Sequence, residues 1–235
     1  MKKILATLFL VLCSALGTTP GLAQNPAGDG KLRIFVADRD GNDVKLLVEI
    51  PNASYHGSPH WSSDGKLILL NAMPGDRQFQ LARIYACAVG GPFNGNVADM
   101  GVGGYARFSP DMTRISFHVR AGNPEGIQPG IWTMRDDGTD RKRLCDGTRA
   151  RWMPDGKSLI IHSALHSDTG RLVRVDLSDG KELEVLAQDP HADVADKGPG
   201  SGPSVLCDPM THAVQAVEFD YMKPAWVFLD PMAPM

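Results

Sequence analysis

The stretch Ala150-Arg151-Trp152-Met153-Pro154-Asp155-Gly156-Lys157-Ser158-Leu159-Ile160-Ile161 decides the fold of this 235-residue chain. A short strand ends at its tryptophan, an Asp-Gly turn follows, and an apolar strand completes the unit. Asp-Gly suits a tight turn because glycine adopts a positive φ at no steric cost. The segments 58–70 and 106–117 repeat this order, and 204–217 is a degenerate fourth copy.

The repeated unit is typical of a β-propeller blade. Its copies recur at a spacing of roughly 40–50 residues, and units of that length with four short strands form propellers. Continuous apolar strands such as 159–163 predict inner positions covered on both faces, whereas polar segments such as 182–186 predict solvated outer strands. We therefore predict an all-β, propeller-like fold of about four four-stranded blades, as a small closed ring or an incomplete one.

Nine residues mark equivalent positions of the repeat, and the sequence predicts structural roles for them. Equivalent aromatic residues in successive blades are expected to pack between blades rather than to stack on a ligand. The turn aspartates are expected to accept hydrogen bonds from nearby backbone N–H groups, so no catalytic residue is predicted among them. The positions are Trp61, Asp64, Gly65, Phe108, Asp111, Trp152, Asp155, Gly156 and Asp208.

Charge and cysteine content exclude several classes of function. The formal net charge of −3 gives no basic footprint for nucleic acid or for an anionic membrane surface. Cys87, Cys145 and Cys207 form no C-x-x-C pair, and no histidine lies at the spacing of a zinc site. We therefore predict no metal and no cofactor, and we expect these cysteines to be small, partly buried core residues.

The N-terminus has the pattern of a secretory signal peptide. Lys2 and Lys3 precede an apolar stretch that is too short for the ~20 helical residues that span a bilayer, and small residues precede a cleavage site near Ala23. The sequence thus predicts an exported protein, periplasmic or secreted, with no integral membrane span. The predicted organisation is a signal peptide (1–23), a flexible leader (24–31), propeller repeats (32–230) and a tail (231–235).

The segment 131–144, with the sequence IWTMRDDGTDRKRL, leads into the WMPDGK block at 152–157. Together they resemble the repeat of TolB-type β-propellers, a WD-like unit that reads approximately I-W-x-M-x-x-D-G followed by W-S-P-D-G-K. The copies in this chain depart from that pattern at Ser63, Met112 and Met153. The resemblance covers roughly residues 32–165 and implies a fold, since similar blades serve several functions in exported proteins.

The C-terminal part carries a second resemblance. Residues 170–177 and 188–194, and Asp208-Pro209 with 214–217, Tyr221 and Trp226, are similar to propeller segments of prolyl oligopeptidase-family peptidases. In that family the propeller filters access to an α/β-hydrolase domain. No such domain follows here, and Gly200-Ser201-Gly202 lacks the spacing of a G-x-S-x-G nucleophile elbow. The peptidase's catalytic groups therefore have no matching positions in this sequence, and we predict that the chain is not an enzyme.

These observations predict an exported, non-catalytic propeller that binds proteins or peptides, or acts as a scaffold, in the cell envelope. A rigid set of blades presents its rim loops at little ordering cost, and the candidate loops are 71–77, 121–128 and 164–170. The alternative is the propeller portion of a prolyl oligopeptidase-type serine peptidase that has lost, or lacks, its catalytic domain. Self-association that completes a ring, or a remnant whose blades do not close, also stays open.

Overall fold

The computed structural model describes residues 11–12, 31–75, 78–195, 203–208 and 213–229. In these residues the chain forms eighteen β-strands in five antiparallel sheets, together with two 3-10 helices of three residues each. The predicted all-β class and propeller-like architecture are confirmed. We number the sheets as blades 1 to 5 in chain order.

Three of the blades are complete four-stranded meanders, because each strand pairs with the next one along the chain. In all three, the sequence repeat supplies the first two strands and the turn between them. The strands are β4 (Tyr55–Trp61), β5 (Leu67–Met73), β6 (Arg83–Ala88) and β7 (Val97–Val102) in blade 2; β8 (Gly104–Phe108), β9 (Arg114–Val119), β10 (Gly130–Arg135) and β11 (Lys142–Cys145) in blade 3; and β12 (Thr148–Trp152), β13 (Ser158–Ser163), β14 (Arg171–Asp176) and β15 (Glu182–Ala187) in blade 4.

The first and last blades have three strands each. The strand pair expected near 32–50 forms a separate blade, so the described residues hold five sheets. β1 lies inside the predicted signal peptide, and cleavage near Ala23 would remove it and leave the edge of β2 unpaired. The leader residues 24–30 and the tail 231–235 lie outside the described residues. The strands are β1 (Val11–Leu12), β2 (Lys31–Val36) and β3 (Lys45–Pro51) in blade 1, and β16 (Val205–Cys207), β17 (Val214–Phe219) and β18 (Ala225–Phe228) in blade 5.

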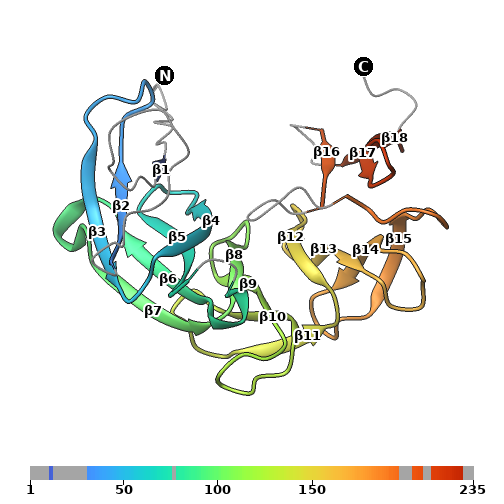
Figure 1. Cartoon of the computed structure of the whole chain (residues 1–235), viewed down its shortest axis with the longest axis horizontal. Helices are drawn as coiled ribbons and strands as arrows, with labels where there is room; N and C mark the ends of the chain where they lie inside the picture. The colour runs from blue at the N-terminus through green and yellow to red at the C-terminus, as the bar shows by residue number, and fades with distance from the viewer. Residues whose placement is uncertain (1–10, 13–30, 76–77, 196–202, 209–212, 230–235) are drawn as a thin grey trace.

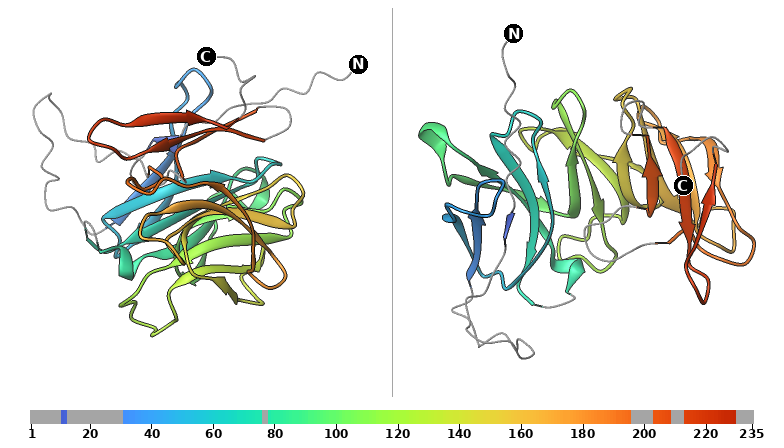
Figure 2. Two further views of the ribbon diagram at one scale, coloured as in Figure 1. Left: turned by 90° about the vertical axis from the view of Figure 1, so that its right-hand side faces the viewer. Right: turned by 90° about the horizontal axis from the view of Figure 1, so that it is seen from above.

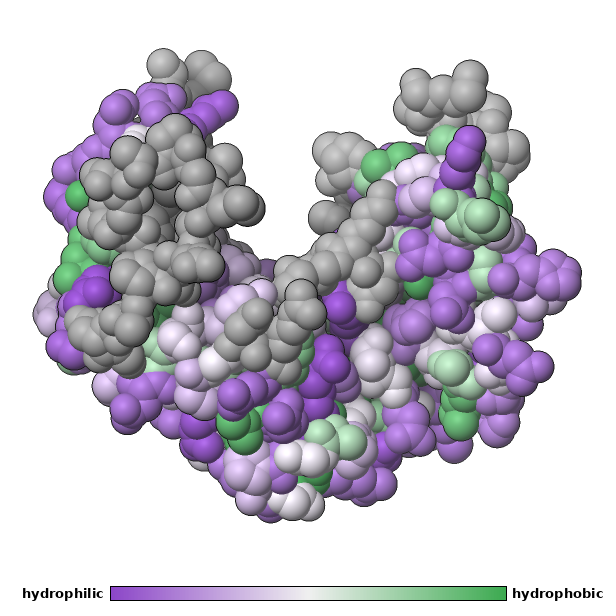
Figure 3. All heavy atoms as spheres, viewed as in Figure 1, coloured by the Kyte–Doolittle hydropathy of each residue, from purple (hydrophilic) through white to green (hydrophobic). Residues whose placement is uncertain are grey.

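The blades stand side by side along an arc (Figures 1 and 2). The first strands of blades 2 to 5, namely β4, β8, β12 and β16, line the inside of the arc, and the strands β7, β11 and β15 lie on its outside (Figure 1). Blades 1 and 5 are the two ends, and an opening separates them (Figure 3). The described residues therefore form an open ring.

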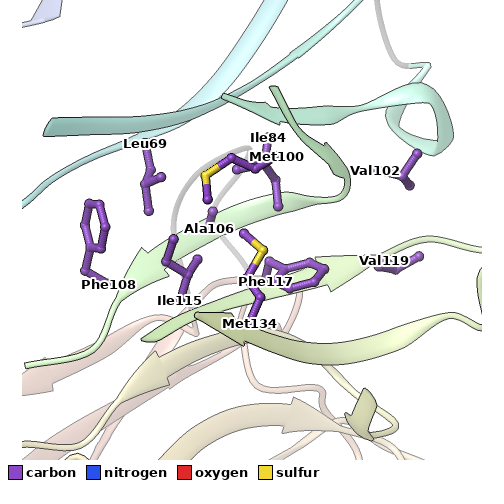
Figure 4. Packing of buried hydrophobic residues seen from close by; sticks show 10 residues of the cluster. All are labelled: Leu69, Ile84, Met100, Val102, Ala106, Phe108, Ile115, Phe117, Val119 and Met134. Atoms are coloured by element: carbon purple, nitrogen blue, oxygen red, sulfur yellow. The ribbon is translucent and has the colours of Figure 1, made fainter. Parts of the chain in front are cut away.

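The apolar core lies between neighbouring blades. Four clusters of buried residues each join side chains from two successive sheets. Between blades 2 and 3, for example, Leu69 and Ile84 pack against Phe117 and Met134 (Figure 4). Full burial of one such side chain contributes about 1.5–3 kcal/mol. The interfaces between blades therefore supply most of the hydrophobic stabilisation of this fold.

Each complete blade has the same irregularity in its innermost strand. The register between the first and second strands shifts at Gly57/His60, Gly104/Arg107 and Thr148/Arg151. Inside each shift one non-glycine residue adopts a left-handed conformation, with φ near 55° in every case. Such a β-bulge bends the strand and redirects a side chain. The residues concerned are Ser58 (φ 53°), Tyr105 (φ 55°) and Arg149 (φ 58°).

The repeated turns also share one conformation. Gly65 and Gly156 have φ values of 71° and 62°, and Met112, which replaces glycine in the second copy, has φ 63°. A non-glycine residue costs about 1–2 kcal/mol in this region. The Met112 side chain packs against the core between blades 2 and 3, and its Sδ accepts a hydrogen bond from the Ser63 amide at 3.4 Å. These contacts offset the backbone cost.

We expect Gly156→Ala to lower the free energy of unfolding by about 1 kcal/mol, because a Cβ atom disfavours positive φ. Nothing lies within 4 Å of the added Cβ, so backbone conformation is the sole cause. Gly156→Asn is the matched control, since asparagine tolerates the left-handed region. Urea denaturation of both variants checks this, and equal stability of the two would contradict it.

We also expect Trp152→Phe to destabilise the protein by about 1–3 kcal/mol. The Trp152 indole Nε1–H donates a hydrogen bond of 3.0 Å to the Arg107 carbonyl oxygen, which joins blades 3 and 4. Phenylalanine keeps the aromatic packing and removes the donor. The control is Trp226→Phe, because Trp226 in β18 is 46% exposed. Thermal unfolding measures both, and a loss no greater than that of the control would refute the assignment.

Candidate functional site

The two faces of the arc carry different loops. Because the blades are antiparallel meanders, the Asp-centred turns lie on one face, which we call the turn face. The loops between β5 and β6, β9 and β10, and β13 and β14 lie on the opposite face, which we call the mouth face. The three candidate rim loops predicted from sequence, 71–77, 121–128 and 164–170, belong to these connections. The topology thus brings all three to the mouth face.

The turn aspartates accept local hydrogen bonds. Asp64 Oδ1 accepts from the Ser62 hydroxyl at 2.7 Å and from the Lys66 amide at 3.1 Å. Asp111 accepts in the same way from Ser109 and Thr113, and Asp155 from the amides of Lys157 and Ser158. Hydrogen bonds from the Ser62 side chain are the largest cause of the lowered pKa of Asp64. These carboxylates are placed to hold the turns.

The aromatic repeat positions lie in the interfaces between blades. Phe108 belongs to the core between blades 2 and 3, while Trp61 and Trp152 pack against the clusters that join blades 1 and 2 and blades 3 and 4. Asp208 follows β16, where its carboxylate accepts a hydrogen bond of 3.4 Å from the Gln215 side chain. None of these four residues lines the mouth-face cavity described next.

The mouth face carries a cavity of about 370 Å³ between blades 2 and 3. One wall comes from the 3-10 helix η1 (Phe79–Leu81) in the β5–β6 loop, and the other from the end of β9 and the loop after it. The lining residues are Phe79, Gln80, His118, Arg120 and Ala121. Its small size suits a single side chain or a chain end rather than a folded domain.

Aromatic rings and guanidinium groups surround this cavity. Arg120 lies over the Phe79 ring with its Cζ atom 5.0 Å from the ring centroid, and Tyr55 contacts Phe79 edge-on at 6.1 Å between centroids. On the inner side, Tyr105 stacks on His118 at 6.2 Å, and Arg149 lies over the Tyr105 ring at 4.9 Å. Blades 2 and 3 line the cavity, and blade 4 adds Arg149 through its contact with Tyr105, so the complete set of contacts exists only in the assembled arc.

The β-bulges put two of these residues in place. Tyr105 and Arg149 are the left-handed residues of β8 and β12, and Ser58 is their equivalent in β4. The Tyr105 amide donates to Asn71 Oδ1 at 3.4 Å, which ties the bulge of blade 3 to the second strand of blade 2. Bulges next to functional sites commonly redirect side chains in this way. We take the cavity and these residues as the candidate site, and call it the mouth site.

His118 is the buried polar group of the mouth site. It is 7% exposed, and among the described residues its Nδ1 atom has no hydrogen-bond partner. Burial, reinforced by the positive charges of Arg120 and Arg149, lowers the pKa of His118 from 6.5 to about 4. The imidazole is therefore neutral at pH 7 and can donate or accept one further hydrogen bond.

Basic groups continue along the inner strands towards the turn face. His60, Arg107 and Arg151 occupy one repeat position, directly before the aromatic residue. Burial, together with the charge of Arg151, lowers the pKa of Arg107 to about 10, and burial with the charge of Arg107 lowers the pKa of His60 to about 4. The inner wall of the arc thus carries positive charge on adjacent strands.

The turn face holds a second cavity, of about 620 Å³, between blades 2 and 3. It is lined by the repeat positions Asp64 and Phe108 and by the 3-10 helix η2 (Gly91–Phe93), whose Phe93 is 65% exposed. Its charged lining residues are Asp64, Asp136 and Lys66, and Lys66 forms an ion pair of 3.4 Å with Asp64. No aromatic–arginine contact borders it among the described residues.

The cysteines of this chain are thiols of low reactivity. Within the described ranges, Cys87, Cys145 and Cys207 are free thiols, and burial raises the pKa of Cys87 to about 12 and that of Cys145 to about 11. Such thiols are poor nucleophiles.

The described residues contain no group of three or more His, Cys, Asp or Glu residues placed to hold a metal ion. They also contain no helix with the length and apolar character to cross a bilayer.

Sequence reasoning found the loops of the mouth face and missed the residues of the mouth site. The missed residues are Tyr55, Phe79, Tyr105, His118, Arg120 and Arg149. One signal was available: Ser58, Tyr105 and Arg149 each lie three residues before the repeat aromatic, so their equivalence could have been noticed. Their left-handed conformation could not, because non-glycine residues rarely adopt it.

Solved structures with the same arrangement of blades include TolB from Acinetobacter baumannii. The TM-score is 0.53 at 20% sequence identity, over 86% of this chain and 50% of that one. A prolyl endopeptidase structure matches with a TM-score of 0.54 at 14% identity, over 83% of this chain and 29% of that one. The resemblance to TolB-type and prolyl oligopeptidase-family propellers is thus confirmed as a likeness of fold.

One sequence relative is dipeptidyl aminopeptidase BIII from Pseudoxanthomonas mexicana, which is 36% identical over 77 residues. That match covers 33% of this chain and 10% of the aminopeptidase. No protein-family model matches the chain. The chain spans half the length of the TolB structure and a smaller part of the peptidases.

We expect stability to fall as the pH drops from about 6.5 to 4. In this window the unfolded chain protonates His60 and His118, while the folded chain keeps both neutral because their pKa values are about 4. His118→Gln should therefore flatten the loss of unfolding free energy between pH 7 and pH 5. Urea denaturation at several pH values measures this. The control Trp226→Phe, at an exposed residue that does not titrate in this range, should keep the wild-type slope, and an unchanged slope in His118→Gln would refute the prediction.

Proposed function

We propose that this chain is an exported, non-catalytic β-propeller that binds a protein or peptide of the cell envelope at its mouth site. The observation that carries the proposal is the Tyr55–Phe79–Arg120 and His118–Tyr105–Arg149 set of ring and cation contacts around one small cavity. Aromatic and arginine side chains are enriched where binding energy concentrates in interfaces. Strands hold the Tyr55, Tyr105, His118 and Arg149 part of this set, while Phe79 and Arg120 lie in the loops after β5 and β9. Binding would therefore need little reordering of the strand residues.

Export and partners belong to the same proposal. The basic, then apolar, then small-residue pattern of residues 1–23 supports cleavage near Ala23 and a periplasmic or secreted location. The solved structures of the same fold include TolB proteins, which supports envelope proteins as partners. Self-association to complete the ring is supported by blade 5, where Trp226 and Phe228 of β18 are 46% and 44% exposed.

A second candidate is the propeller portion of a prolyl oligopeptidase-type serine peptidase. The 36% identity to a dipeptidyl aminopeptidase over 77 residues favours it. In this alternative the chain would gate or support a hydrolase that is not part of the 235 residues, which hold no G-x-S-x-G elbow. The partner would then be a serine hydrolase, which an active-site-directed fluorophosphonate probe detects.

The immobilised mature protein should capture a defined set of proteins from a detergent extract of the cell envelope. Phe79→Ala should reduce that capture about ten-fold or more, because it removes the ring that Tyr55 and Arg120 contact. Quantitative mass spectrometry of the bound fraction measures the effect. Captured proteins that react with the fluorophosphonate probe would favour the peptidase alternative.

Phe93→Ala is the matched control for this experiment. Phe93 also lies in a three-residue 3-10 helix of blade 2, but in the loop on the turn face. Its removal should leave capture unchanged. Equal losses in the two variants, or no loss in Phe79→Ala, would refute the mouth site as the binding surface.

A further inference from the structure

The contacts of the mouth site indicate what kind of ligand it accepts, and this inference rests on the proposed function. Every charged group that acts on His118 is a cation, namely Arg120 and Arg149. Glu125, the acidic residue of the β9–β10 loop, forms an ion pair with Arg83 at 2.7 Å instead. Arg120 has no carboxylate partner among the described residues. Among the described residues, the charges that act on the cavity histidine are therefore positive.

The site also has a polar atom that lacks a partner. His118 lines the cavity, is 93% buried, and leaves its Nδ1 atom without a hydrogen bond in the described part of the chain. A buried polar atom in this state costs roughly 1–3 kcal/mol. The Nδ1 atom itself is enclosed by protein, so a ligand in the cavity would meet the His118 ring rather than this atom. A ligand that carried negative charge would gain the nearby cation Arg120, which also lines the cavity.

The shape and the aromatic lining restrict the ligand further. About 370 Å³ lies at the small end of the range for ligand sites. Phe79 and Arg120 line the cavity together, with the guanidinium over the Phe79 ring, so an apolar side chain beside a bound carboxylate would meet an aromatic residue. Guanidinium groups form strong charge-assisted hydrogen bonds with carboxylates. A chain end, or one acidic side chain, fits this volume.

We propose that the mouth site recognises a carboxylate presented by a peptide segment, with Arg120 as its principal anchor. The carboxylate accepts hydrogen bonds from the Arg120 guanidinium, the peptide lies against the His118 ring, and an adjacent apolar side chain packs beside Phe79. Arg149 contributes positive charge from the neighbouring blade. The carboxylate is either a C-terminus or the side chain of Asp or Glu, and the test distinguishes these sources.

The probes are hippurate, its neutral amide hippuramide, and N-acetylglutamate α-amide, added to the full mature protein. Hippurate combines an aromatic ring, one peptide bond and a terminal carboxylate. We expect hippurate to shift the His118 ring signals in NMR spectra and to bind at least about ten-fold more tightly than hippuramide. Tighter binding of N-acetylglutamate α-amide than of hippurate assigns the site to acidic side chains, and the reverse assigns it to a C-terminus.

Arg120→Gln should weaken hippurate binding about ten-fold and leave hippuramide binding unchanged, while Arg120→Lys should retain part of the affinity. Arg135→Gln is the charge-matched control, since Arg135 ends β10 on the turn face and its side chain is 63% exposed. Hippuramide binding as tightly as hippurate, or an Arg120→Gln variant with wild-type affinity, would overturn the inference.

The two proposals fail separately. Capture of envelope proteins that depends on Phe79, combined with no preference for hippurate, would overturn the carboxylate inference and leave the binding function standing. Hippurate binding that depends on Arg120, combined with no captured envelope protein, would support the carboxylate site and overturn the proposed partner class.

Discussion

A blade of this chain can bury both of its faces only by packing against its neighbours. The apolar clusters lie between successive sheets, with Leu69 and Ile84 of blade 2 facing Phe117 and Met134 of blade 3. The bond from the Trp152 indole to the Arg107 carbonyl crosses from blade 4 to blade 3 in the same way. Packing between blades therefore both stabilises the fold and fixes the relative positions of the blades. Any site formed by several blades depends on this packing.

The mouth site shows this dependence directly. Phe79 belongs to blade 2, Tyr105 and His118 to blade 3, and Arg149 to blade 4, so no single blade could hold the set. The left-handed residues of the inner strands carry local strain of roughly 1–3 kcal/mol each. Packing between blades fixes these strands and maintains the strained conformations. Strain of this kind concentrates at binding sites because it places side chains where a regular strand would not.

The sequence predicted the fold from the spacing of aromatic residues and Asp-Gly turns, which blade geometry requires. It also located the mouth-face loops, since Gly- and Pro-rich segments between apolar strands must be connections. The site itself depends on contacts between residues distant in sequence, such as Phe79 with Arg120 and Tyr105 with Arg149. No local pattern encodes those pairs. The neutral state of His118 likewise follows from burial and from two cations that only the folded arc brings near.

Comparison of the repeats with one another separates the residues that build the fold from those available for binding. Where a blade needs a particular chemistry, the copies agree: an aromatic residue at Trp61, Phe108 and Trp152 is a requirement of packing. Three positions earlier the copies hold Ser58, Tyr105 and Arg149, which share a backbone conformation but have chemically different side chains.

The fold thus requires the bulge at this position but does not restrict the type of side chain there. Positions of that kind can differ between blades without loss of the core, and here two of the three supply a phenol ring and a guanidinium group beside one cavity. The asymmetry of the repeats at these positions is the physical argument for proposing a binding role for this face.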